Sequence, residues 1–435
     1  MTRRLYVLLA SSSVATLCTL KLLQWRARKR AKLVADRAQS HVIEGPLIDT
    51  CNVAVRKRIL PNAIKRASKW MSFQLENPPT PMVGQIGGRN TEKAPILKLE
   101  PDYILKPVQA KEYRGLREVA FYESIKLASS QNNNSNNTAR SELLDFKTAP
   151  SWLLEHCDLV AMWLAILLQD SVVAGSETTL LSSWKSMERE TDLLRRLQRF
   201  TASYYGVVDT ISEPLQLNQH HILMQDVTAS FSKPCVMDIK MGTQTYEPDA
   251  SSEKKRRESE KYAQQTTFGF RVVGMRKYEP SHVDSDENGY RNWDKHHGRS
   301  LSTREAVTEA FATFFRGEPS ESSSSDFNYN NNNEHESSST TGKLRTRSIA
   351  NVQSLLRSLG TRFDENHSLG FYSSSILIVY DAPNSDRANL RMIDFGHVRR
   401  QAGGDPGYRH GLKTLSSILA DLVQDEGQAG RDERS

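Results

Sequence analysis

Cysteine is scarce in this chain. Its 435 residues include only four cysteines, which are Cys18, Cys51, Cys157 and Cys235. They form no CxxC pair and no metal-site spacing, which indicates a reducing compartment and no disulfide framework. Hydrophobic residues make up 38% of the chain, a low share for a protein that is globular throughout. We therefore expect part of the length to remain solvated.

Long apolar runs are also few. The run from Leu5 to Leu20 is marginal for a membrane span, and a basic cluster, RARKRAK, follows it. This heavier positive flank predicts that the rest of the chain faces the cytosol. Three interpretations stay open: a membrane anchor within residues 5–24, a cleaved targeting peptide, or a disordered tail with a nuclear-type basic cluster. We expect a location on the cytoplasmic or nuclear side. Another apolar segment, Trp152 to Asp170, has too short an uncharged core to span a membrane and is predicted to be a buried helix.

The charge balance favours an anionic partner, because the formal net charge is +7. The basic residues are clustered locally and no aromatic residues are interleaved with them. A nucleic-acid partner is therefore not expected. We expect a monomer.

The order of predicted elements is short strands and a helix, then strands, helices, a hairpin of the two strands GFYSSSILIVYD (Gly370 to Asp381) and LRMIDFG (Leu390 to Gly396), and a helix. This order indicates an α+β, two-lobed architecture and not alternating βαβ units. Polar low-complexity inserts are expected at 129–142 and 320–347, and a helical insert at 150–200. The expected boundaries are an N-terminal segment over 1–35, an extension over 36–81, an N-lobe over 82–228, a C-lobe over 229–423 and a loose tail over 424–435.

Three charged residues occur in an order that suits phosphoryl transfer. Lys106 ends an early strand, and Glu118 lies on the next helix, a combination that kinases use to hold ATP phosphates. Asp394, in MIDFG, ends a late strand, where a carboxylate can bind Mg²⁺ between phosphates. A protein kinase is not indicated, because the chain has no HRDxxxxN loop and no GxGxxG before Lys106.

The stretch PCVMDIKMG, from Pro234 to Gly242, is a predicted strand with an unusual pair of charges. Side chains two residues apart on a strand point to the same face. Asp238 and Lys240 are therefore expected side by side. Taken singly, each of these charged residues is more often a solvated surface group. Only their combined order along the chain indicates a site for phosphoryl transfer.

This stretch fits the PxxxDxKxG signature, and with it the chain resembles the inositol polyphosphate kinase family. The resemblance continues through TYEPDASSEKK, FGFRVVGMRKY and HHGRSL, and resumes at FYSSSILIVYD, MIDFGHV and GYRHGLKTL. It covers roughly Met82 to Val423 and is strongest to the multikinase branch. It implies the family's two-lobed fold, with antiparallel sheets, helices and ATP between the lobes. The cofactors would be ATP and Mg²⁺, and the partner an inositol phosphate substrate.

The resemblance also implies roles for individual residues. Lys106 and Glu118 would hold ATP phosphates, and Asp394 the metal. Lys240 would face the inositol hydroxyl, whereas Asp238 would serve either that hydroxyl or the ribose. The implied hinge residues are Gln225, Asp226 and Val227, with Ser374 and Ser375 beside the nucleotide and His397 near the substrate.

A basic segment, SSEKKRRESEK, is predicted to be a helix that carries Lys254, Arg257 and Lys261 on one face. With the resemblance, this face is interpreted as a site for substrate phosphates. Without it, the interleaved glutamates favour a solvated helix. The chain departs from the multikinase pattern at Arg257, Glu258 and Lys295, which replace glutamines, and at IDFGH, which replaces IDFAH. Lys295 is nevertheless predicted to bind the substrate.

The predicted function is ATP-dependent phosphorylation of an inositol phosphate, from trisphosphate to tetrakis- and pentakisphosphate. Two alternatives stay open. One is an inositol hexakisphosphate kinase that makes pyrophosphates. The other is a non-catalytic phosphoinositide-binding scaffold, against which the intact set of Lys106, Asp238, Lys240 and Asp394 argues.

Overall fold

The structure is a computed structural model of the whole chain. It describes residues 63–65, 67, 78–86, 95–99, 101–109, 114–130, 189–190, 192–208, 220–248, 250–318, 342–384 and 386–432. The predicted membrane segment 5–24, most of the helical insert 150–200 and most of both low-complexity inserts lie outside this part of the chain. Within the described residues, no helix is both long and apolar enough to cross a membrane.

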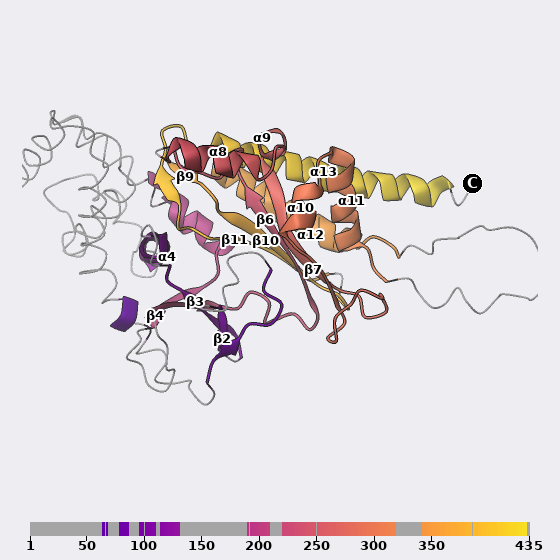
Figure 1. Cartoon of the computed structure of the whole chain (residues 1–435), viewed down its shortest axis with the longest axis horizontal. Helices are drawn as coiled ribbons and strands as arrows, with labels where there is room; N and C mark the ends of the chain where they lie inside the picture. Colours follow the sequence, from indigo (N-terminus) through magenta and orange to yellow (C-terminus); the bar gives the residue numbers. More distant parts are fainter. Residues whose placement is uncertain are drawn as a thin grey trace, which may run out of the picture.

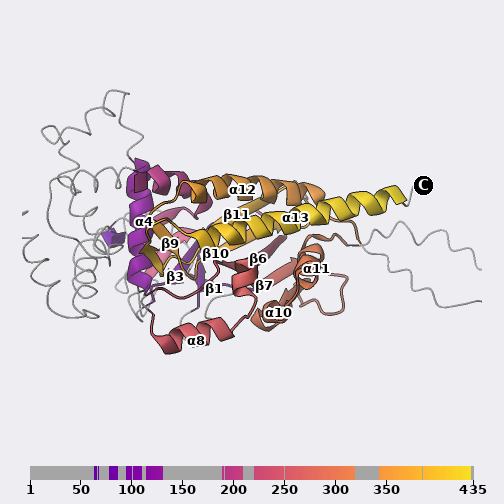
Figure 2. The same cartoon turned by 90° about the horizontal axis from the view of Figure 1, so that it is seen from above.

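The N-lobe is built on a five-stranded antiparallel sheet in the order β1-β2-β3-β5-β4. One helix, α4 (Arg114–Ser130), packs against β4, and Figure 2 shows it lying crosswise at the end of the long C-lobe helices. The strands are β1 (Thr80–Pro81), β2 (Leu97–Leu99), β3 (Tyr103–Pro107), β4 (Tyr204–Val208) and β5 (His221–Gln225).

A second antiparallel sheet, in the order β11-β10-β6-β7-β8, forms the C-lobe. A short pair, β9 with β12, lies beside it. In Figure 1 the N-lobe strands lie below this sheet. The strands are β6 (Pro234–Met241), β7 (Phe270–Tyr278), β8 (Tyr290–Trp293), β9 (Leu369–Phe371), β10 (Ser375–Asp381), β11 (Ala388–Ile393) and β12 (Val398–Arg400).

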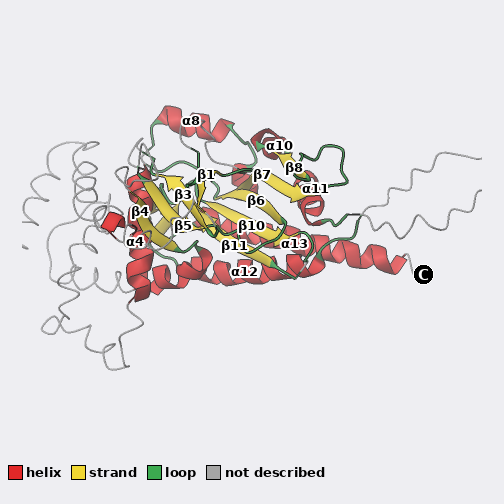
Figure 3. Cartoon of the chain, turned by 90° about the horizontal axis from the view of Figure 1, so that it is seen from below, coloured by secondary structure: helices red, strands yellow, loops and turns green. Residues whose placement is uncertain are grey.

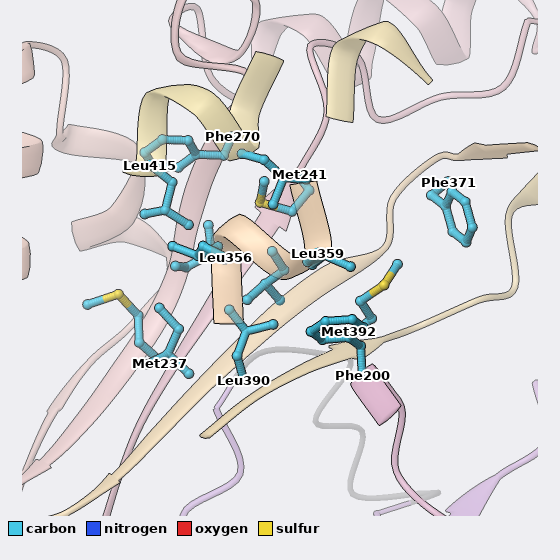
Figure 4. Packing of buried hydrophobic residues seen from close by; sticks show 14 of the residues in the cluster. Phe200, Met237, Met241, Phe270, Leu356, Leu359, Phe371, Leu390, Met392 and Leu415 are labelled. Atoms are coloured by element: carbon cyan, nitrogen blue, oxygen red, sulfur yellow. The ribbon is translucent and has the colours of Figure 1, made fainter. Parts of the chain in front are cut away.

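Helices cover one face of the C-lobe sheet, because alternate strand residues there are apolar. Met237, Ile239 and Met241 of β6 are fully buried, and α13 packs on that strand. Figure 4 shows Leu356 and Leu359 of α12 packed with Leu390 and Met392 of β11. The helices are α8 (Ser252–Glu260), α9 (Gln265–Phe268), α10 (Lys295–Ser300), α11 (Arg304–Phe315), α12 (Thr346–Asp364) and α13 (Pro406–Asp432), and a 3₁₀ turn, η4 (Gln198–Phe200), precedes β4.

Three predicted boundaries differ from the structure. The loose tail from residue 424 is wrong, because α13 runs on to Asp432 and Glu426 of this helix accepts a hydrogen bond from the amide of Leu344. The second insert ends before 347, since α12 already begins at Thr346. The segment from Gly370 to Asp381 is not one strand, because Ser373 adopts a φ of 56° and separates β9 from β10.

Candidate active site

Lys106, Glu118 and Asp394 meet where the two lobes face each other. The Lys106 ammonium lies 2.7 Å from Oε1 of Glu118 and 2.5 Å from Oδ1 of Asp394. Lys106 comes from β3, Glu118 from α4, and Asp394 directly follows β11. The strand lysine and the helix glutamate therefore form the ion pair that the sequence predicts, and the late aspartate joins them.

The backbone at Asp394 is unusual. Its φ of 66° places a residue other than glycine in the left-handed region, which carries a conformational cost. The next residue, Phe395, stacks on Phe121 of α4 with 4.2 Å between ring centroids, and its amide donates to Glu118 at 3.4 Å. Gly396 follows, and a Cβ there would lie 3.0 Å from the carbonyl oxygen of Arg114. Gly396 therefore lets α4 approach this turn closely.

Burial sets the protonation of this cluster. It disfavours the charged form of Lys106, but the carboxylates of Asp394 and Glu118 outweigh it and raise the pKa of the ammonium. Burial raises the pKa of Glu118, with Lys106 opposing it. Burial also disfavours the Asp394 carboxylate, but Lys106 and Lys240 outweigh it and lower the pKa of this group. We expect Lys106 charged and Asp394 ionised at neutral pH.

Asp238 and Lys240 lie on the face of β6 opposite its buried apolar residues. The Lys240 ammonium donates to the carbonyl oxygen of Ser373 at 3.1 Å. Burial raises the pKa of Asp238 to about 7, and Asp394 raises it further than Lys240 lowers it. Burial also lowers the pKa of Lys240. This pair therefore titrates closer to neutrality than either group would in water.

Three buried oxygens of predicted site residues have no hydrogen-bond partner among the described residues, although Lys98 forms an ion pair with Oδ2 of Asp226 at 3.9 Å. They are Oδ2 of Asp226, Oδ1 of Asp238 and Oγ of Ser375. Buried polar atoms are normally satisfied, so orphans grouped between two lobes point to a polar ligand. Ribose hydroxyls and an adenine amine are donors that would fit these acceptors, and Lys106 would fit phosphate. Ser374 differs, because its hydroxyl already donates to Phe371.

The other two predicted hinge residues lie on either side of Asp226. Gln225 ends β5, and its amide donates to the carbonyl oxygen of Ser203 at 2.9 Å. Val227 is partly buried against the core. Asp226 itself accepts hydrogen bonds from the amide and hydroxyl of Thr228 through its other oxygen, at 2.8 and 2.6 Å.

A divalent cation also fits the donor set. Asp394 keeps 35% of its side chain exposed, and Mg²⁺ commonly takes one or two protein carboxylates with phosphates and water. The described residues contain no group of three or more His, Cys, Asp or Glu side chains that could hold a metal ion alone. Any Mg²⁺ here would therefore depend on the nucleotide phosphates for most of its ligands.

The predicted substrate helix is α8, and its basic residues are not equivalent. Lys254 binds Oε2 of Glu247 at 2.9 Å, and Lys261, which caps the helix, binds Glu258 at 2.5 Å. Arg257 keeps 59% of its side chain exposed, and its closest carboxylate lies 4.0 Å away. Two of the three predicted cations are thus already paired within the chain, and Arg257 is the most accessible.

His397 belongs to a cluster that the sequence did not reveal. Its Nδ1 contacts Oε1 of Glu247, and Arg399 donates to the same oxygen at 2.9 Å. Lys254 binds the other oxygen. These cations outweigh burial and lower the pKa of Glu247, whereas burial lowers the pKa of His397. Glu247 therefore fixes His397 and the start of α8 to the C-lobe.

Arg271 is a second residue that the sequence analysis missed. It is opposite Lys240 in the β6–β7 register, is buried, and donates a hydrogen bond to Oε1 of Gln265 at 3.3 Å. Burial lowers the pKa of its guanidinium, with Glu258 opposing it. An arginine in the apolar strand FGFRVV is the signal that could have identified it.

Lys295, by contrast, is exposed at the start of α10, and no hydrogen bond or ion pair among the described residues joins it to the cluster.

Comparison with known proteins identifies the C-lobe. The family model described as "IPK: Inositol polyphosphate kinase" matches residues 221–420. Over these residues the chain is similar to the inositol polyphosphate kinase family. This match includes Asp238, Lys240 and Asp394, whereas Lys106 and Glu118 precede it, so the place of these two in the site rests on their geometry.

Two curated relatives show the extent of the similarity. Human inositol polyphosphate multikinase is 32% identical over 204 residues, which cover 46% of this chain and 41% of that protein. Mouse inositol hexakisphosphate kinase 3 is 29% identical over 240 residues, which cover 49% and 53%. The chain thus spans about half the length of the curated relatives it matches. A solved structure of inositol phosphate multikinase Ipk2 from S. cerevisiae, in complex with ADP and Mn²⁺, is 23% identical with a TM-score of 0.39, over 52% of this chain and 90% of that one.

Proposed function

We propose that the chain is an ATP-dependent inositol polyphosphate kinase of the multikinase type. It would transfer the γ-phosphate of ATP to hydroxyls of an inositol phosphate and convert a trisphosphate to tetrakis- and pentakisphosphate. The observation that carries the proposal is the meeting of Lys106, Glu118 and Asp394 beside the Asp238–Lys240 pair of β6. The match to the family model over residues 221–420 and the relatives' names support it.

Each residue of the site would have a distinct task. Glu118 holds the Lys106 ammonium so that it can bind phosphate oxygens. Asp394 would hold Mg²⁺, which when bound supplies positive charge between the phosphates. Lys240 would neutralise the charge that develops on the transferred group, because its ammonium lies on the same strand face as Asp238. Asp238 would accept a hydrogen bond from a ribose or substrate hydroxyl.

A second candidate is an inositol hexakisphosphate kinase. The identity to the mouse hexakisphosphate kinase, 29%, is close to the 32% for the human multikinase. Extra positive charge at Arg257 and Lys295, where the multikinase pattern has glutamines, would suit a substrate with more phosphates.

The membrane association of residues 5–24, the cytosolic or nuclear location, the monomeric state and the absence of a nucleic-acid partner remain predictions.

Product mapping tests the proposal. The full chain is incubated with Mg²⁺, ATP and, separately, inositol tris-, tetrakis- and hexakisphosphate. Phosphorylation of the tris- and tetrakisphosphates supports the multikinase reading, and pyrophosphate formation from the hexakisphosphate supports the second candidate. Lys240→Ala should strongly lower the rate of either reaction. Lys413→Ala, which removes an exposed lysine of α13, should not. A wild-type chain that phosphorylates none of the three would favour the scaffold reading instead.

A further inference from the structure

A hollow of the molecule is lined by none of the charged residues of the candidate active site. It has a volume of about 400 Å³, and five arginines line it: Arg195, Arg196, Arg199, Arg362 and Arg391. We refer to it as the arginine cavity. Its other lining residues are all uncharged, and of the predicted site residues only Gln225 of the hinge is among them.

The cavity is built at the junction of the two lobes. Ser203, which lines it, accepts a hydrogen bond from the amide of Gln225 in the N-lobe sheet. Thr201 forms a parallel bridge to Met392 of β11 in the C-lobe sheet. Figure 4 shows Phe200 against Met392 in the core. Because strand residues alternate, Arg391 points away from the core face that Met392 occupies.

The cavity also lies apart from the proposed substrate helix. Arg362 belongs to α12, and Figures 2 and 3 show α12 and α8 at opposite edges of the molecule. A ligand in the arginine cavity would therefore not be the phosphates held by α8. The positive charge of the arginine cavity is therefore separate from that of α8.

Two carboxylates neutralise only part of this charge. Asp192 pairs with Arg195 and Arg196, and Glu365 binds Arg196 at 3.3 Å and Arg362 at 2.8 Å. Among the described residues, five guanidiniums therefore face two carboxylates.

The two remaining arginines have no carboxylate partner among the described residues. Arg199 lies over the ring of Phe200, at 4.6 Å from its centroid. Arg391 binds only its own strand, at Asn389 and the carbonyl of Leu390, and its Nε is buried without a hydrogen-bond partner. A partly buried guanidinium with an unused donor is costly unless an acceptor is supplied.

We propose that the arginine cavity binds a small molecule that carries two or more phosphate groups. Guanidinium groups bind phosphate through paired, charge-assisted hydrogen bonds, and several converging on one hollow favour a multiply charged anion. The volume lies within the range of small-molecule sites. Gln198 and Thr201 add uncharged polar groups that can orient the ligand.

Titration calorimetry with inorganic tripolyphosphate tests this site on the full chain in metal-free buffer. Arg199→Gln combined with Arg391→Gln should weaken binding at least about tenfold, because charged hydrogen bonds are lost. The matched control, Arg316→Gln with Arg347→Gln, removes two arginines that pair with surface carboxylates and should bind as the wild type does. Lys106→Met with Lys254→Ala should keep the affinity of the cavity site, since these lysines belong to the proposed active site.

Three results would overturn the proposal: no binding to the wild type below about 1 mM, unchanged binding in the Arg199 and Arg391 variant, or loss of the signal in the Lys106 and Lys254 variant. If the double variant has a lowered melting temperature, the single variant Arg199→Gln replaces it, because Arg199 is exposed. This variant should still weaken binding about fivefold. Unchanged binding would count against the site. Competition by inositol hexakisphosphate, ADP or pyrophosphate then distinguishes an inositol phosphate, a nucleotide and an inorganic ligand.

Discussion

The ammonium of Lys106 lies 2.5 Å from Oδ1 of Asp394, although 288 residues separate them in sequence. Glu118 holds the other side of the same ammonium. One lysine thus bridges a glutamate of the N-lobe and the proposed metal-binding aspartate of the C-lobe. The position of the lysine depends on both carboxylates, and this dependence can be tested.

Asp394→Asn should lower kcat about 10²-fold or more, because Mg²⁺ loses its anionic protein ligand. The fold should persist, since the amide can still accept a hydrogen bond from Lys106. Steady-state kinetics at saturating Mg²⁺, with melting curves, measure both effects. Asp386→Asn, which changes an exposed aspartate, is the matched control. Turnover near the wild-type level would rule out the metal role of Asp394.

Asp238→Asn should make the ligand-free protein more stable than the wild type at pH 8. The folded pKa of Asp238 is about 7, above the usual value of about 3.9. The folded protein therefore holds a proton that the unfolded chain releases, and the wild type loses stability as the pH rises from about 4 through 7. Melting temperatures across this range should diverge with rising pH, and a constant difference would contradict the assigned pKa. Turnover should fall in the same variant, because the amide donates where a carboxylate would accept.

Local sequence predicts the parts of this site that depend on strand alternation. Asp238 and Lys240 share a face because they are two residues apart in an apolar strand, and Lys106 ends a strand just before the helix of Glu118. The φ of Asp394 and the break at Ser373 have no such signal, since neither position is a glycine. Glu247, His397 and Arg399 come together only through tertiary packing, so spacing cannot reveal them. The end of α13 contains few apolar residues, and for this reason the sequence predicts a loose tail there. The helix nevertheless continues beyond residue 423.

Glu247→Gln should destabilise the protein at pH 7 by about 3 kcal/mol, because the side chain is buried and pairs with Arg399, Lys254 and His397. The folded pKa of Glu247 lies below its usual value. Its contribution is therefore present above about pH 4.3 and is lost as the pH falls further, through the folded pKa. Denaturant unfolding at pH 7 and pH 3 should show a large difference that shrinks with acid. Glu309→Gln, in an exposed ion pair, should show little at either pH.

The pairing within α8 predicts opposite effects from two neighbouring substitutions. Arg257→Ala should raise KM for the inositol phosphate about tenfold, because Arg257 is the most accessible cation of the helix and charged hydrogen bonds are strong. Glu258→Gln should instead lower this KM. Its carboxylate occupies Lys261 and attracts Arg271, so its removal frees positive charge for substrate phosphates. KM for ATP should move little in both variants, since ATP phosphates belong to Lys106 and Asp394. Lys240→Ala should differ from both by lowering kcat more than it raises KM, because its charge acts where negative charge develops. An increase of KM in Glu258→Gln would show that this glutamate supports the helix and does not compete with the substrate.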